Sequence, residues 1–133
     1  MLGDLCETFA FFAVNKVMSE NYEQLSVSVE TFEPFVLCLA LGTLQAIKSG
    51  IWSSEAGIWT IGRPNFLDKL EELKISEETL NLLVQFDELN ALEELVEKEV
   101  FESKILEIEE AIKSRLENFP KNYWQAKWLS ETP

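Results

Sequence analysis

The chain has 133 residues, 47% of them hydrophobic, and its 24 acidic residues outnumber 11 basic residues to give a net charge of −13 at pH 7. A chain of this size and apolar content buries a core without disulfides or metal ions, which argues against disorder. Its negative surface repels phosphate groups, so the charge argues against nucleic acids and anionic membranes and favours a basic protein partner. The same charge could simply keep a small apolar protein in solution.

Two cysteines and two short apolar runs bear on the compartment in which the protein resides. Cys6 and Cys38 stand alone in apolar sequence without metal-binding spacing, as is typical of small buried side chains in a reducing compartment. The run 9–14 follows acidic residues and not the basic region of a signal peptide. The run 35–42 has eight residues, whereas about 20 are needed to cross a bilayer. We therefore expect a cytoplasmic protein without a membrane partner.

The first thirty residues contain one helical and one alternating pattern. Apolar residues at helical spacing predict a first helix over residues 4–19. Residues 22–30 alternate polar and apolar side chains, which is typical of a strand, but no partner strand is evident in the sequence. An extended loop and a lone strand therefore both remain open for this segment.

Residues 32–49 are apolar on nearly all sides, which predicts the central, buried helix of the fold. Thr31 is the expected N-cap, and Pro34 fits the first turn, where the missing N–H of proline has no helical partner to lose. Gly50 is expected to adopt the left-handed conformation that commonly follows a helix C-terminus.

Shorter helical segments follow the central helix. Ser53 is the expected N-cap of a helix ending near residue 61, and Asn65 of a helix over 66–73. Ser76 is the expected N-cap of a further helix, with acidic residues in its first turn.

The last helical stretch covers residues 92–119, with or without a break near Glu99, until Pro120 stops it. The aromatic tail, 119–133, is expected to pack on the body. These elements predict an all-α fold, an irregular bundle of about five to seven helices in a single domain spanning 1–133. The last stretch has an apolar stripe at helical spacing, formed by Phe101, Ile105, Ile108, Ile112, Leu116 and Phe119.

The sequence contains no histidine, which excludes serine–histidine and cysteine–histidine nucleophiles, the HExxH zinc motif and histidine-containing di-iron sites. No phosphate-binding glycine motif is present. We therefore predict a protein that is not an enzyme and that has no cofactor and no metal site. Catalysis by a pair of carboxylates is the remaining alternative, because two acids can cleave a glycosidic bond.

The candidate functional feature is an acidic segment over residues 87–110. Its ten acidic and two basic residues give a net charge of −8 (−10 + 2). Acidic side chains three and four residues apart on a helix repel one another, so a face that tolerates this repulsion could bind a cationic partner. An ordinary solvated helix face is the alternative. The predicted partner-binding residues are Asp87, Glu88, Glu93, Glu94, Glu97 and Glu99.

Four tryptophans and one arginine have two interpretations each. Trp52 and Trp59 could line a ligand site, but their large apolar area favours packing in the core or at its rim. Arg63 is expected to pair with a carboxylate, with anion binding as the alternative. Trp124 and Trp128 would share one face of a helical tail and dock on the body or on a partner. A homodimer that forms through these tryptophans is a further alternative.

One pattern of residues covers about 31–95, namely 41–50, 53–56, Pro64, Leu67, Leu70, Ile75, Ser76 and 87–89. In this pattern the sequence resembles a family of small bacterial helical proteins of uncharacterised function. Its general organisation is similar to that of immunity proteins of polymorphic-toxin systems, including contact-dependent growth inhibition. The resemblance implies a cytosolic immunity or inhibitor protein that neutralises a basic toxin domain, such as a nuclease, through its acidic helical surface. A non-catalytic, self-associating structural or adaptor protein is the alternative.

Overall fold

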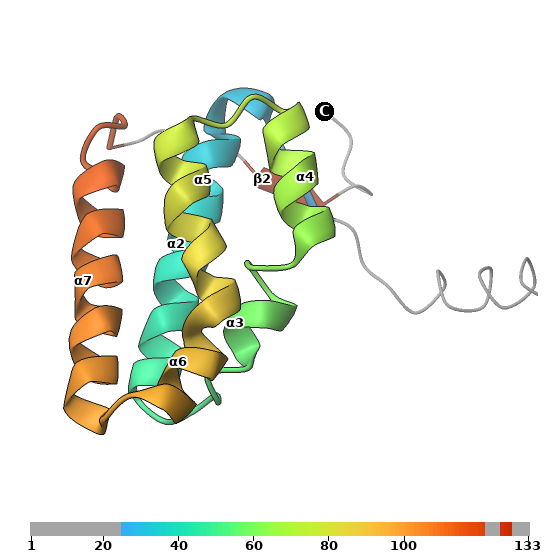
Figure 1. Ribbon diagram of the computed structural model, residues 1–133. Helices are drawn as coiled ribbons and strands as arrows, with labels where there is room; N and C mark the ends of the chain where they lie inside the picture. The colour runs from blue at the N-terminus through green and yellow to red at the C-terminus, as the bar shows by residue number, and fades with distance from the viewer. Residues whose placement is uncertain (1–24, 122–125, 129–133) are drawn as a thin grey trace, which may run out of the picture. The chain divides into compact units, whose positions relative to one another are not determined.

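The structure, a computed structural model, describes residues 25–121 and the backbone of residues 126–128 (Figure 1). The all-α fold class is confirmed, because helices dominate and the strands in the described part are two of three residues each. Residues 27–121 belong to one compact unit, here called the helical body, and residues 25–26 and 126–128 belong to another. The predicted helix over 4–19 lies outside the described residues. The single-domain organisation stays a prediction.

The described strands are β1 (Leu25–Val27) and β2 (Ala126–Trp128), which pair in a two-stranded sheet. Of the segment 22–30, residues 25–27 are a strand, Val29 and Glu30 begin α2, and residues 22–24 lie outside the described residues. The expectation that the strand has no partner is wrong. The partner comes from the other end of the chain, so no turn motif links the two in the sequence. Because residues 126–128 are a strand, the helical arrangement under which Trp128 would share a face with Trp124 does not apply.

The helical body is built around α2, which packs most extensively against α7 and also contacts α3 and α5, while α5 contacts both α4 and α7 (Figure 1). Its elements in chain order are α2 (Val29–Lys48), α3 (Ala56–Trp59), α4 (Pro64–Glu72), α5 (Glu77–Val84), the 3-10 helix η1 (Gln85–Glu88), α6 (Leu89–Leu95) and α7 (Lys98–Leu116).

A continuous apolar core joins these helices. The fully buried large side chains of α2 and α7 belong to the same cluster as Phe86 of η1 and Leu70 of α4. Burial of each such side chain contributes roughly 1.5–3 kcal/mol. The predicted α7 stripe is confirmed as core, with Phe101, Ile105, Ile108 and Ile112 buried and Leu116 and Phe119 packed against them.

Helix α2 also has the length and apolar composition of a membrane span. In the helical body, however, eight of its twenty residues are buried. The half-buried Cys38 belongs to this helix, and burial raises the pKa of its thiol, as expected of a cysteine that packs as a small apolar side chain.

The start of α2 differs from the prediction and its end agrees with it. The helix begins at Val29 with Ser28 as N-cap, so Thr31 is a buried residue of the first turn and Pro34 lies inside the helix. The Thr31 side chain still bonds the helix start, because its hydroxyl lies 2.8 Å from the Ser28 hydroxyl. This local bond allows the helix to extend one turn further than the proline suggests.

Gly50 has a φ of 76°, which confirms the left-handed C′ position. The Ile51 N–H donates to the Ala46 carbonyl at 2.9 Å and the Gly50 N–H to the Ile47 carbonyl at 3.1 Å. This double closure is the Schellman motif, and it turns the chain sharply towards α3.

The shorter helices confirm one of their three predicted caps. Helix α3 begins at Ala56 with Glu55 at the N-cap, so Ser53 is not its cap. Ser76 is the N-cap of α5, and its hydroxyl accepts a hydrogen bond from the Thr79 N–H. Helix α4 begins at Pro64 with Arg63 at the N-cap, so Asn65 is not its cap. Proline at a first helical position accounts for this earlier start of α4. In the last helical stretch the break falls after Leu95, before the predicted Glu99.

Candidate functional site

The six predicted partner-binding carboxylates, here called the acidic surface, are all exposed. Two of them lie on η1, two on α6, one at the N-cap of α7 and one in the first turn of α7. An acidic residue near a helix N-terminus is stabilised by the helix dipole, which favours the last two positions. In chain order, the acidic surface comprises Asp87, Glu88, Glu93, Glu94, Glu97 and Glu99.

Residues of the acidic surface form no ion pair with any lysine or arginine of residues 25–121. Only Glu93 has a side-chain hydrogen bond there, from the Ser54 hydroxyl at 2.6 Å. The same hydroxyl lies 3.0 Å from Asn90 and is 2% exposed, so it joins the loop before α3 to α6. The negative charges of the acidic surface are therefore exposed to solvent.

Two glycines hold η1, and with it Asp87, against α3. A Cβ atom on Gly62 would lie 2.7 Å from the Asp87 backbone nitrogen, and one on Gly57 would lie 2.8 Å from the Phe86 carbonyl oxygen. Neither approach is open to a residue with a side chain. The start of the acidic surface thus depends on close backbone contact.

A groove of about 950 Å³ lies where the C-terminus of α2 meets α6 and the first turns of α7. Glu93 and Glu99 line it together with Glu102, over an apolar floor that includes Phe101. Lys48 and Lys98 also line the groove, so its lining carries charges of both signs. The structure brings these two predicted residues together, whereas Asp87, Glu88, Glu94 and Glu97 do not line the groove.

A second polar cluster surrounds Glu109, a residue that the sequence alone does not distinguish from the rest of the acidic segment. Its side chain accepts hydrogen bonds from Gln45 Nε2 at 2.7 Å and Lys48 Nζ at 3.3 Å, and it pairs with Lys113 Nζ at 3.1 Å. Burial by itself would raise the pKa of Glu109, but these two ammonium groups lower it overall, and hydrogen bonding to Glu109 raises the pKa of Lys113. Glu109 is therefore a structural link between α2 and α7.

The Glu109→Gln variant is expected to lose about 1–2 kcal/mol of stability at neutral pH, because two ammonium groups lose their charged partner. A lowered folded-state pKa stabilises the protein above the unfolded-state pKa, and this contribution disappears as the pH falls through the folded value. Between about pH 6 and about pH 3, the free energy of unfolding measured in urea should accordingly fall more steeply for the original protein than for the variant.

Glu110→Gln is the matched control. Glu110 contacts the same Lys113 at 3.7 Å but is exposed, so its substitution should cost less than about 0.5 kcal/mol. Equal effects of the two substitutions would contradict the structural role of Glu109.

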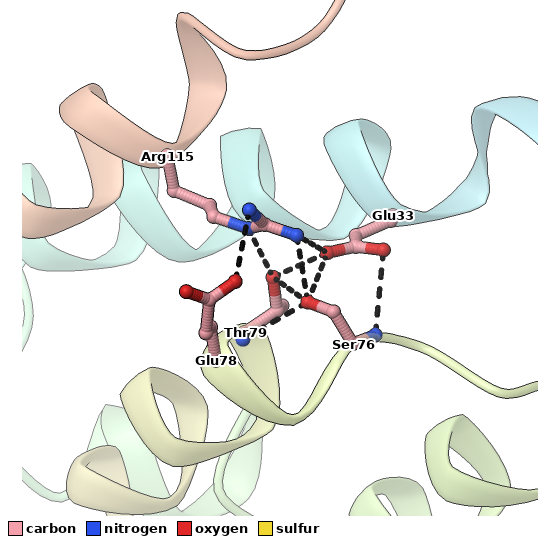
Figure 2. Close-up of polar contacts among 5 residues, drawn as sticks. All are labelled: Glu33, Ser76, Glu78, Thr79 and Arg115. Atoms are coloured by element: carbon pink, nitrogen blue, oxygen red, sulfur yellow. Dashed lines mark hydrogen bonds and ion pairs between the residues drawn. The ribbon is translucent and has the colours of Figure 1, made fainter.

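A third polar cluster joins α2, α5 and α7 (Figure 2). Arg115 Nη2 lies 3.2 Å from Glu33 Oε2 and donates to the Ser76 hydroxyl at 2.8 Å, while its Nε donates to the Thr79 hydroxyl at 3.2 Å. The Thr79 hydroxyl donates in turn to Glu33. Glu78 pairs with the outer side of Arg115 at 3.2 Å. The cap residue of α5 thus also bonds the other two helices.

The chemistry of this third cluster is that of a closed network. Burial tends to raise the pKa of Glu33, but hydrogen bonds from Thr79, Ser76 and Arg115 hold it below its ordinary value. Among the described residues, no buried side-chain polar atom lacks a hydrogen-bond partner, and no group of three or more metal-binding side chains is present. A satisfied network of this kind fixes helix positions.

The tryptophan interpretations are partly wrong. Trp52 is 50% exposed and Trp59 is 62% exposed, so neither belongs to the core. The Arg63 guanidinium lies 5.7 Å from the ring centre of Trp59 and forms no ion pair with the described carboxylates. Trp124 and the side chain of Trp128 lie outside the described residues.

These observations define the class of protein: a small, acidic, all-α protein whose acidic surface forms no ion pair with the described residues. The chain belongs to the family described as "Protein of unknown function (DUF3969)", whose model matches residues 27–130. That match begins at the first residue of the helical body and includes the whole acidic surface. Neither a curated protein nor a solved structure matches the chain.

Proposed function

We propose that the protein is a cytoplasmic immunity or inhibitor protein that binds and neutralises a basic bacterial toxin domain, such as a nuclease, through the acidic surface. The observation that carries the proposal is the set of six exposed carboxylates that form no ion pair within the described chain. The proposal assigns the protein no catalytic role and no cofactor.

The neighbouring networks support a specific use of these carboxylates. Lys48, Lys113 and Arg115 are paired with Glu109 and Glu33, which leaves them little capacity to neutralise the acidic surface. Mutual repulsion among the free carboxylates falls when a cationic surface approaches, and long-range attraction speeds the encounter. A nuclease cleft is cationic because it binds phosphates, so an acidic protein can occupy or cover it.

The test uses the basic C-terminal domain of the secreted toxin that the proposal requires in an adjacent reading frame. Replacing Glu88, Glu94 and Glu97 together with lysine should weaken the complex at least about tenfold, because each reversed charge repels the cationic partner. Titration calorimetry at low and high salt provides the measurement, and added salt should weaken the original complex. Glu93 is left unchanged because it bonds Ser54.

A matched variant separates the acidic surface from total charge. Asp68, Glu71 and Glu117 are exposed and form no ion pair within the described chain, so their replacement with lysine changes the net charge equally elsewhere. This control should retain most of the affinity. Equal affinity of the two triple variants, or an adjacent gene without any basic domain, would count against the proposal.

Self-association is the second candidate function, favoured by the exposure of Ile51, Trp52 and Trp59. Exposed apolar side chains that lie together often mark a protein interface. Sedimentation equilibrium discriminates the two functions, since a salt-insensitive homodimer without a basic partner would favour a structural or adaptor role.

A further inference from the structure

Trp52 and Trp59 line one pocket at the start and end of the α3 segment, with a volume of about 550 Å³. Ile51, which is 73% exposed, forms part of the same pocket. Tryptophan is the residue most enriched in the energetic centres of protein interfaces, and two half-exposed rings around one hollow are unusual for a surface without a partner.

Two opposite charges flank this pocket, Glu55 in its lining and the Arg63 guanidinium against its Trp59 ring. Glu55 is the one charged side chain in its lining, is exposed, and forms no ion pair with the described lysines and arginines. Its carboxylate lies 3.5 Å from Trp59 Nε1, which keeps it beside the ring. The pocket therefore combines two aromatic rings with a carboxylate that forms no ion pair with the described residues.

Arg63 provides an example of the ligand chemistry within the same chain. Its guanidinium lies over the Trp59 ring, 5.7 Å from the ring centre, in a cation–π contact. A guanidinium is planar and weakly hydrated, so it can stack on indole and bond a carboxylate at the same time.

We infer that the pocket between Trp52 and Trp59 receives an arginine side chain of the basic partner, with Glu55 pairing its guanidinium. This inference rests on the proposed function and names the partner chemistry next to the acidic surface. The chain that forms the pocket is tied to that surface, because the buried Ser54, between the pocket residues Ser53 and Glu55, donates a hydrogen bond to Glu93. A second copy of the chain fits less well, since two chains of charge −13 repel one another.

The test is a titration of the full-length protein with a blocked Gly-Arg-Arg-Gly peptide, followed by the indole N–H signals of Trp52 and Trp59 in heteronuclear NMR spectra. The control peptide carries citrulline, which has nearly the shape of arginine without its charge. We expect both indole signals to shift with the arginine peptide and the citrulline peptide to bind about tenfold more weakly.

Two substitutions assign the binding to the pocket. Glu55→Gln keeps the shape and should weaken the arginine peptide about fivefold to tenfold, while Asp68→Asn removes an equal charge from α4 and should leave binding unchanged. Trp59→Leu should reduce the shift of the Trp52 indole signal. Both Glu55 and Trp59 are exposed, so these variants are expected to fold.

The outcomes separate this inference from the proposed function. Equal binding of both peptides, no shift of either indole signal, or indole shifts that follow protein concentration without peptide would each overturn the arginine pocket. If the peptide moves only backbone signals of residues 87–99, the pocket is overturned while the acidic surface remains. If the indoles respond but the Glu88, Glu94 and Glu97 reversal leaves the toxin complex unchanged, the pocket stands and the acidic surface is overturned.

Discussion

Replacing Gly62 with alanine is expected to destabilise the helical body by about 2–4 kcal/mol. The new Cβ atom would lie 2.7 Å from the Asp87 nitrogen, 3.0 Å from the Gly57 carbonyl oxygen and 3.1 Å from the Asp87 Cα. All three neighbours are backbone atoms, so no side chain can rotate away to make room. Either η1 moves away from α3 or the hydrogen bond from the Gly62 N–H to Gly57, 2.8 Å long, is broken.

Gly42→Ala is the matched control for this substitution. Gly42 lies inside α2, and a Cβ atom there would meet nothing within 4 Å. Alanine at this position should stabilise the protein by about 0.5–1 kcal/mol, because glycine is the poorer helix former. Urea unfolding of both variants measures the difference. If Gly62→Ala unfolded at as high a urea concentration as Gly42→Ala, the close packing of η1 on α3 would be contradicted.

Replacing Arg115 with methionine is expected to cost about 2–3 kcal/mol at neutral pH. Methionine retains much of the apolar volume, but Glu33 loses its cationic partner while its side chain remains only 16% exposed. The hydroxyl groups of Ser76 and Thr79 lose hydrogen bonds from Arg115 as well. The Glu33 carboxylate would then lie between α2, α5 and α7 without a cationic partner.

The loss caused by Arg115→Met should shrink under acid. The pKa of Glu33 is lowered in the folded protein, so the carboxylate stabilises the fold above its unfolded-state pKa, and this contribution disappears as the pH falls through the folded value. Without Arg115 that pKa rises, and stability should depend less steeply on pH between about pH 6 and about pH 3.

Glu78→Gln is the control for the arginine, since Glu78 pairs with the same guanidinium but is 79% exposed. Its substitution should change stability by less than about 0.5 kcal/mol. Unfolding curves for the two variants at several pH values decide the matter. If Glu78→Gln lowered stability as much as Arg115→Met, the exposed pair of Glu78 and Arg115 would stabilise the cluster, and not the contacts of Arg115 with Glu33.

Local sequence was enough to determine most of the helices, some of their ends and the position of much of the core. Ser76 and Gly50 act within one helical turn, through a side-chain cap and a left-handed backbone conformation, so their roles need no tertiary information. The α7 stripe likewise follows from the helical period alone. The acidic segment was also evident, because charge can be counted without a fold.

Only the tertiary structure decided which acidic residues remain free. Glu109 and Glu93 have the same chemistry and both lie in the acidic segment, yet Glu109 is buried between lysines and Glu93 is exposed. The separation arises because α2 brings Lys48 beside α7 from 61 residues away. The pairing of β1 with β2 and the exposure of Trp52 and Trp59 were likewise not predictable. Each depends on the distance between segments far apart in the chain, and neither period nor composition encodes that distance.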